Sequence, residues 1–190
     1  MIREAVLRRL AVPFILLSLS LTPTFASAAS KGPKITGIVG EVKNRQARIS
    51  FNVTDAFSPE MVEALKSGIE VSFRTAIRVE RVHRRWFDTT VGDVEFSRSV
   101  RYDALSRVYR LHRENGEELL TDVLDAIEGM TRYSVVVPIS AEVDRGKKYR
   151  AYVKTRLDKV GLSEPLRSIF FFSSLWDIET TWEKGYLHAP

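Results

Sequence analysis

The sequence predicts a mainly β protein, an immunoglobulin/fibronectin III-like antiparallel β-sandwich with two short helices at about 58–67 and 121–129. In many segments apolar and polar residues alternate with a period of two, which is typical of strands that bury one face. Only two segments show a helical period, and the connections between segments are short. Roughly eight or nine strands with two helical turns favour two packed sheets over alternating strands and helices.

Residues 1–28 are typical of a secretory signal peptide, because a basic start precedes an apolar run and a tail of small residues. The tail predicts cleavage between Ala28 and Ala29. The apolar run, residues 10–21, is shorter than the roughly 20 residues of a spanning helix and contains Pro13. We therefore expect a cleaved signal and no stable transmembrane span after cleavage, with retention as an anchor as the alternative. A Sec-type signal predicts the periplasm, with secretion as the alternative location.

Residues 29–190 are expected to form a single β-sandwich domain, because no repeat, low-complexity tract or linker interrupts them. The chain has no cysteine, so its core must hold this domain together without disulfides. The formal net charge is +5, and removing the signal peptide leaves 26 basic and 23 acidic residues, or +3. Ten arginines, no lysine and five acids lie between Arg74 and Arg113, so an electrostatic partner is expected at that face.

The first predicted elements of the domain are a hairpin and a capped helix. Residues 35–42 and 47–54 alternate on either side of the polar turn at 43–46. In the following helix, Ser58 is placed to cap the free amides, Pro59 suits the first turn, and Gly68 suits a left-handed end. Both ends of this helix are therefore predicted from single residues.

A second helix is expected after a tight turn at Asn115-Gly116, with Thr121 as its cap. Its predicted apolar stripe consists of Leu120, Val123, Leu124 and Ile127. Between the two helices, Tyr102-Asp103-Ala104-Leu105 predicts a hairpin turn in which Asp103 bonds local amides and Leu105 folds under.

The remaining strands are predicted from alternation that begins at residues 71, 94, 133 and 149. Tyr149 follows Gly146 in the manner of a tyrosine corner, whose hydroxyl bonds back to the main chain; an ordinary turn is the alternative. Near the C-terminus, Phe170–Phe172 predict a strand buried on both faces, or one face that packs on a partner. The last strand is predicted to place Trp176, Ile178 and Trp182 on one face.

A basic stretch, Ile77–Thr90, supplies the candidate binding residues. Its apolar positions change phase between Val79 and Val82, which predicts a β-bulge near Glu80 and Arg81. With a turn at about 88–90, pairing would place Arg85 opposite Asp93 and His83 opposite Glu95, and Trp86 in the core or at the sandwich edge. The candidate partner-binding patch is Arg81, His83, Arg84, Arg85 and Trp86.

Catalytic and metal-binding patterns are not found in the sequence. There is no Gly-x-Ser-x-Gly elbow and no cysteine nucleophile, and the three histidines are far apart. The sequence therefore predicts no catalytic residue, no cofactor and no metal site. A carboxylate pair contributed by distant strands stays open as a hydrolase alternative.

Nucleic acid is disfavoured as a partner of the arginine-rich stretch. Arginine binds phosphate and aromatic rings stack on bases. An exported domain with a net charge of +3 and no recognition helix, however, does not fit that role. Anionic lipid headgroups, acidic glycans or an acidic protein face suit the same side chains better.

Several motifs together resemble a family of small exported bacterial proteins defined as a domain of unknown function, family 4390. The resemblance covers about 35–182, and it lies in Trp86-Phe87-Asp88, Tyr102-Asp103-Ala104-Leu105 with Tyr109, Pro165-Leu166-Arg167, and the pair Trp176 and Trp182. It carries over no catalytic or cofactor residue. It suggests partner binding, because members are expected to be encoded beside a membrane sensor kinase.

The first function hypothesis is therefore a non-enzymatic periplasmic interaction module that binds another envelope component. The alternative is a small-ligand or lipid-headgroup binding protein or sensor of the periplasm, and an unrecognised hydrolase is the third hypothesis.

Overall fold

The computed structural model describes residues 32–140, 142–144, 146–158 and 178–189. The predicted signal peptide, its cleavage site at Ala28 and Ala29, the Pro165 motif, Phe170–Phe172 and Trp176 lie outside the described residues. None of the helices in the described part combines the length and apolar character needed to cross a membrane.

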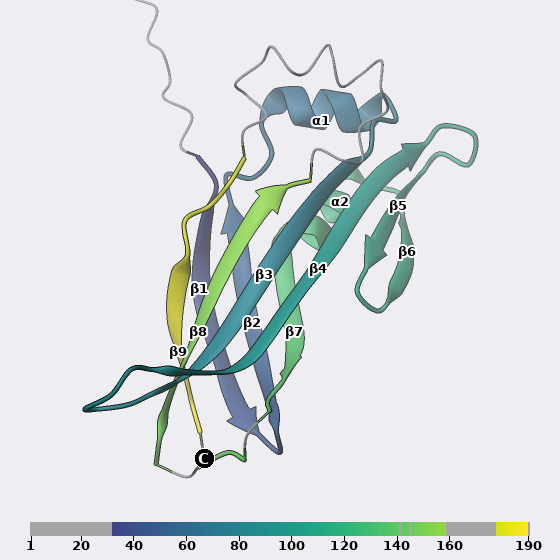
Figure 1. Ribbon diagram of the computed structural model, residues 1–190. Coiled ribbons are helices and arrows are strands. Elements are labelled where there is room, and N and C mark those ends of the chain that lie inside the picture. Colours follow the sequence, from purple (N-terminus) through teal and green to yellow (C-terminus); the bar gives the residue numbers. More distant parts are fainter. Residues whose placement is uncertain (1–31, 141, 145, 159–177, 190) are drawn as a thin grey trace, which may run out of the picture. The chain divides into compact units, whose positions relative to one another are not determined.

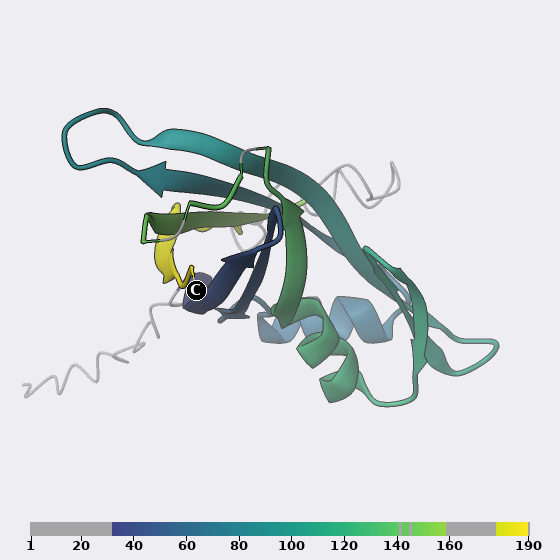
Figure 2. The same ribbon diagram turned by 90° about the horizontal axis from the view of Figure 1, so that it is seen from below.

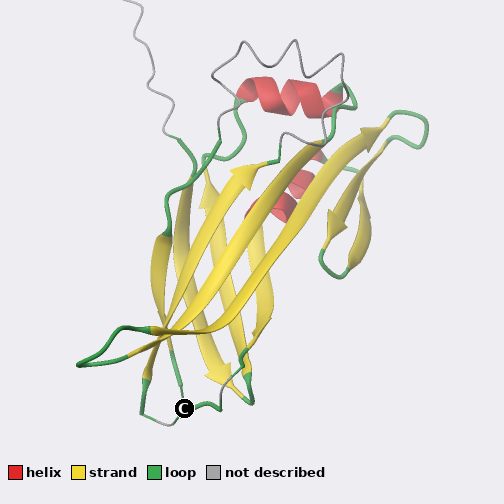
Figure 3. Cartoon of the chain, in the orientation of Figure 1, coloured by secondary structure: helices red, strands yellow, loops and turns green. Residues whose placement is uncertain are grey.

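Two antiparallel sheets dominate the described part of the chain (Figures 1 and 3), which confirms the predicted mainly β sandwich with two short helices. One sheet has the order β1-β2-β7 and the other β6-β5-β4-β3-β8-β9. The elements are β1 (Lys34–Lys43), β2 (Gln46–Thr54), α1 (Pro59–Lys66), β3 (Val71–Val82), β4 (Thr89–Asp103), β5 (Val108–Arg113), β6 (Gly116–Leu120), α2 (Val123–Thr131), β7 (Arg132–Pro138), β8 (Lys148–Leu157) and β9 (Glu183–Leu187).

The finer immunoglobulin-like assignment is not confirmed by the strand order. Immunoglobulin sandwiches distribute consecutive strands between the two sheets. Here β3, β4, β5 and β6 follow one another as a meander within a single sheet. The short turns after β4 and β5 keep the chain in that sheet, because a tight hairpin can only add a neighbouring antiparallel strand.

The β1–β2 hairpin forms where the alternation predicts it. Asn44 and Arg45 at its turn both have positive φ, of 50° and 59°, as the central residues of a type I′ turn do. Next to this turn the two sheets meet. The Val42 amide donates to the carbonyl of His188 at 2.7 Å, and the His188 amide donates to the carbonyl of Gly40 at 2.9 Å. The C-terminal end of the described chain is thereby tied to β1.

Helix α1 has the predicted ends. The Ser58 hydroxyl accepts from the Met61 amide at 3.3 Å, and Gly68 adopts a φ of 85°. Met61 and Leu65 are buried against the core. Local sequence alone was sufficient here, because both caps act within one turn of the helix.

Helix α2 corrects two predictions. Asp122, not Thr121, is the cap, and its carboxylate accepts from the Leu124 amide at 2.6 Å. The buried side is Ala126, Gly129 and Met130, whereas Leu124 is 70 % exposed. The packing of the helix against β5 selects the face with small residues, because a Cβ on Gly129 would lie 2.4 Å from Leu111 Cδ2.

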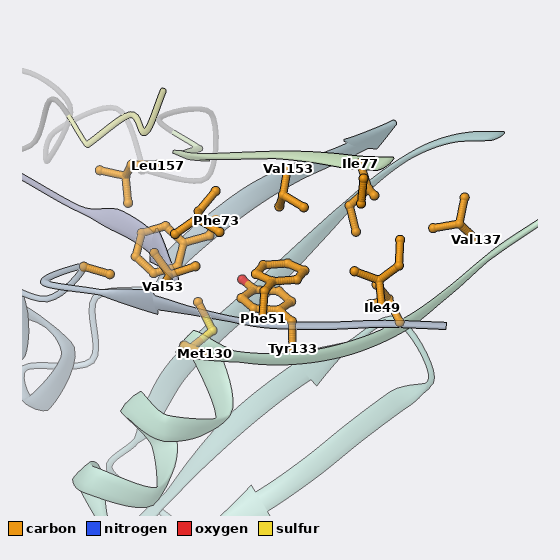
Figure 4. Packing of buried hydrophobic residues seen from close by; sticks show 14 of the residues in the cluster. Ile49, Phe51, Val53, Phe73, Ile77, Met130, Tyr133, Val137, Val153 and Leu157 are labelled. Carbon is orange, nitrogen blue, oxygen red and sulfur yellow. The ribbon is translucent and has the colours of Figure 1, made fainter. Parts of the chain in front are cut away.

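The core lies between the two sheets (Figure 4). Phe51 and Tyr133 stack with ring centroids 4.6 Å apart, and Ile49, Ile77 and Val153 are fully buried around them. Side chains from β2, β3, β7 and β8 thus meet in one apolar layer, as sheet-on-sheet packing requires.

Two predicted local hydrogen bonds are present. The Asp144 amide donates to the Tyr149 hydroxyl at 3.0 Å, which is the back-bond expected of a tyrosine corner. Asp103 Oδ1 accepts from the Leu105 amide at 3.0 Å and from the Ser106 amide at 3.3 Å. Leu105, however, is 99 % exposed, so the prediction that it folds under was wrong.

The last strand also differs from its prediction. Ile178 is buried and its carbonyl accepts from the Leu157 amide at 2.8 Å. Trp182 is exposed and its ring lies 5.4 Å from the guanidinium carbon of Arg78. Regular pairing of β9 starts only at Glu183, opposite Val153. Ile178 and Trp182 therefore do not lie on one buried face, because the predicted alternation is broken before β9 begins.

Candidate functional site

The β3–β4 hairpin carries the candidate patch, and it extends outward past the other strands (Figures 1 and 2). The two strands are paired from Val71 and Val100 to Arg81 and Thr89. They are the longest in the described part of the chain, with 12 and 15 residues. The loop that joins them, residues 83–88, is therefore held at the end of a long paired stem, in which β3 also pairs with β8 up to Val82.

The predicted bulge is present, but its extra residue lies on the partner strand. Opposite Val79 and Glu80, β4 advances from Gly92 to Thr90, so Val91 is the additional residue. β3 itself pairs with β8 without a break from Phe73 to Val82. The phase change in the sequence therefore marks the approach to the loop, not an insertion in β3.

The predicted cross-strand pairs were wrong. Asp93 lies opposite Arg78 and Glu95 opposite Ala76, because the turn closes at 83–88 and not at 88–90. Arg78 Nε is 4.0 Å from Asp93 Oδ2, and Arg74 Nε is 3.7 Å from Glu95 Oε1. The acids that were expected to neutralise His83 and Arg85 are thus occupied by arginines further down the stem.

Four consecutive residues at the turn form what we call the hairpin tip: Arg84, Arg85, Trp86 and Phe87. All four are exposed, and Trp86 and Phe87 expose 82 % and 96 % of their surface. Neither arginine has an ion pair or hydrogen bond to any residue that the structure describes. The expectation that Trp86 is a core or edge residue was wrong, because the earlier turn places it beyond the last strand pair.

The base of the tip is braced by Asp88. Its Oδ1 accepts from the His83 amide at 3.0 Å, and its Oδ2 lies 3.3 Å from Nη1 of Arg150. His83 Nε2 lies 3.2 Å from the Thr89 hydroxyl. The hydrogen bond from Arg150 to the Tyr152 hydroxyl raises the pKa of that guanidinium above its usual value. Asp88 is therefore paired with a cation, whereas the two arginines of the tip have no acidic partner among the residues that the structure describes.

Arg81 does not belong to the exposed group. It lies on β3 opposite Tyr149, and its Nη1 is 2.8 Å from Asp144 Oδ2. Because Asp144 also bonds to the Tyr149 hydroxyl, Arg81 helps to fix the loop that precedes β8. The structure thus brings together Arg84, Arg85 and Trp86, places His83 beneath them, separates Arg81, and adds Phe87, which the candidate patch omitted.

The ten arginines between Arg74 and Arg113 do not form one face. Several are used within the chain: Arg110 Nη2 is 3.0 Å from Asp103 Oδ2, and Arg113 Nη2 is 2.8 Å from Glu118 Oε2. In the part of the chain that the structure describes, only the tip presents two neighbouring arginines beside exposed aromatic rings. The alternation of polar and apolar residues in the sequence could not show which arginines are paired, because their acidic partners come from neighbouring strands.

A buried arginine, which sequence reasoning missed, lies elsewhere in the chain. Arg98 on β4 is 3 % exposed, and its Nη2 contacts both carboxylate oxygens of Glu114 at 3.0 and 2.9 Å. Its Nη1 donates to the carbonyls of Gly129 and Arg132 at 2.7 and 2.8 Å, and its guanidinium carbon lies 4.0 Å from the ring centroid of Tyr133. Its position in an alternating strand could have indicated an inward-facing charge.

A polar cavity of about 490 Å³ opens beside Arg98, between α2 and the β5–β6 hairpin. Of its carboxylates, Glu114 contacts Arg98, Glu118 contacts Arg113, and Glu128 contacts Arg132. Among the described residues no group of three or more histidines, cysteines and carboxylates is placed to hold a metal ion. The arginine–carboxylate ion pairs around this cavity therefore have a structural role, since they hold parts of the fold together.

The fold and the tip define the class of the protein: a two-sheet, mainly β module with a projecting, basic and aromatic hairpin. The family described as Domain of unknown function (DUF4390) matches residues 30–185. The chain belongs to this family, and the match confirms the resemblance over slightly more of the chain than the motifs indicated. No curated protein matches the chain significantly.

Proposed function

We propose that this protein is a non-enzymatic interaction module, exported to the periplasm, that binds another component of the cell envelope through its hairpin tip. The observation that carries the proposal is the exposure of Trp86 and Phe87 beside two arginines that have no partner among the described residues. Tryptophan and arginine are the residues that most often dominate binding energy at interfaces. Scattered single apolar residues are normal on a surface, but two adjacent aromatic rings on a projecting turn need a binding explanation.

The stem of the hairpin supports the proposal, because it holds the tip in place before binding. The paired strands run to Arg81 and Thr89, and Asp88 bonds the loop to both His83 and Arg150. A loop fixed at its base loses less conformational freedom when it binds than a free loop does. The tip is therefore prepared for contact without further folding.

The two other hypotheses have weaker support. A small ligand between the sheets would need space there, but Phe51, Tyr133 and their neighbours fill that region. A hydrolase would need a free carboxylate pair, and three of the four carboxylates that line the cavity beside Arg98 each contact an arginine, Asp125 being the fourth. The proposed periplasmic location rests on residues 1–28, which have the pattern of a signal peptide.

Sedimentation with the envelope fraction of the cells that make the protein tests this function. We expect the parent protein to sediment with the envelope, and the double variant Arg85→Glu/Trp86→Ser to remain in the supernatant. The matched control is Leu105→Ser/Arg107→Glu, which makes the same two kinds of change on the exposed β4–β5 turn. Equal sedimentation of the parent and the tip variant would contradict the proposal.

A further inference from the structure

We propose that the envelope component bound by the hairpin tip is the surface of a bilayer that contains anionic phospholipid. This inference rests on the proposed function and names the partner of the same site. Trp86 and Phe87 would enter the boundary between headgroups and acyl chains, and Arg84 and Arg85 would contact phosphate groups.

The size and position of the tip favour a bilayer over a protein partner. The tip lies at the turn of a hairpin that extends past the neighbouring strands (Figures 1 and 2). An aromatic side chain buries about 150–250 Å², so the pair would bury about 300–500 Å². A specific protein interface usually buries about 800 Å² on each partner. Two aromatic side chains are thus too few for such an interface by themselves, whereas insertion into a membrane boundary needs no matching surface.

The residue types of the tip fit the two layers of a membrane boundary. Tryptophan is enriched where headgroups meet the acyl chains, because its ring is apolar and its N–H is polar. Arginine binds phosphate through several donors, and its long stem allows the charge to remain at headgroup level. The single acid next to the tip, Asp88, is bonded to Arg150 and the His83 amide. Within the described part of the chain, the tip therefore presents two positive charges without an acidic partner directly beside its apolar rings.

Further basic residues lie at the same end of the sandwich. Lys148 pairs with Val82 at the end of the stem, and Lys147 precedes it. In the β1–β2 turn, Lys43 and Arg45 are exposed, and the Arg45 carbonyl accepts from the Ile139 amide at 2.8 Å.

Two acids in the loop before β8 lie at this end as well. Asp144 is bound by Arg81 at 2.8 Å, and Glu142 is exposed. Among the described residues named at this end, the exposed basic residues outnumber the acids, so this end is suited to a negative surface. Attraction of each basic residue to such a surface falls off within a Debye length, so the residues nearest the membrane contribute most.

Co-flotation with protein-free vesicles tests the inference. The vesicles contain either equal parts of phosphatidylglycerol and phosphatidylcholine or phosphatidylcholine alone. We expect the parent to float with the first and much less with the second. Arg84→Gln/Arg85→Gln should lower the partition coefficient on anionic vesicles roughly 25-fold, since each arginine near an anionic surface contributes about fivefold. Added salt should reduce parent binding.

Tryptophan fluorescence reports whether the tip itself enters the bilayer. Vesicles with brominated acyl chains should quench the emission of the parent, and the quenching should be lost in Trp86→Phe, which keeps an aromatic ring but not the reporter. The comparison is needed because Trp176 and Trp182 also emit. The control variant Leu105→Ser/Arg107→Glu should bind and be quenched as the parent is. Far-ultraviolet circular dichroism of every variant checks that the fold is retained.

The outcomes separate the inference from the proposed function. Binding to whole envelopes that disappears after protease treatment of the envelopes, with no binding to vesicles, would identify a protein partner such as a membrane sensor kinase. It would overturn the lipid inference and leave the proposed function standing. Absence of binding to both envelopes and vesicles would overturn both. Equal binding to the two vesicle types, or quenching that persists in Trp86→Phe, would also overturn the inference.

Discussion

Replacement of Arg98 by methionine tests how the end of α2 is held in the fold. The change removes two hydrogen bonds to the carbonyls of Gly129 and Arg132, which lie at the C-terminal end of the helix. The Gly129 carbonyl belongs to the last turn of α2, where no intrahelical donor is provided, and the Arg132 carbonyl follows at the start of β7. It also removes the contact with the Tyr133 ring, while the methionine refills part of the apolar volume.

The expected cost is about 2–6 kcal/mol of unfolding free energy. A buried carbonyl left without a donor costs about 1–3 kcal/mol, and two are affected. The stranded carboxylate of Glu114 contributes less, because its side chain is 20 % exposed and can be hydrated.

Urea unfolding followed by circular dichroism measures this cost. The matched control is Arg101→Met on the exposed side of β4, and its unfolding free energy should lie within about 0.5 kcal/mol of the parent's. Hydrogen exchange should show lost protection in α2. The double variant Arg98→Met/Glu114→Leu separates the causes. If it recovers most of the lost stability, the cost came from the stranded carboxylate and the reasoning from the helix carbonyls is refuted; we expect little recovery.

Three further perturbations test local features. Tyr149→Phe should lower the unfolding free energy by about 1 kcal/mol through loss of the bond from the Asp144 amide, and an unchanged urea midpoint would contradict this. Gly129→Ala should lower it by about 1 kcal/mol, because overpacking against Leu111 outweighs the gain in helix propensity; the same change in a Leu111→Ala background should not destabilise. Hydrogen bonds from Ser106 and then from Arg110 hold the pKa of Asp103 well below its usual range, so this carboxylate stabilises the folded state above about pH 4 and loses that effect as the pH falls through its folded pKa. Urea unfolding from pH 2 to 7 should therefore show the parent more stable than Asp103→Asn at the upper end with a difference that shrinks on acidification, and a constant difference would refute it.

The sequence predicted part of the hairpin tip. It indicated Arg84, Arg85 and Trp86 as candidates, because a basic run beside an aromatic residue is unusual in a strand. It placed the turn too late and assigned Trp86 to the core or edge. The register between β3 and β4 decides the position of the turn, and it is set by pairing along the whole stem.

Features that depend on neighbouring residues were determined by the sequence itself. The caps of α1, the β1–β2 turn and the bonds of Asp103 and Tyr149 all act over a few residues, so the local pattern specifies them. The alternation likewise determined that the protein is built from two-faced strands, because a period of two buries one side of each strand.

Only the tertiary structure decided which arginines are paired and which have no partner within the described part of the chain. Arg81 finds Asp144 and Arg98 finds the end of α2, whereas Arg84 and Arg85 are left at the tip. In the sequence these arginines look alike, since each belongs to the same basic region. Their partners are brought by strand pairing and helix packing from residues 16 to 63 positions away, so their roles follow from the fold and not from the local pattern.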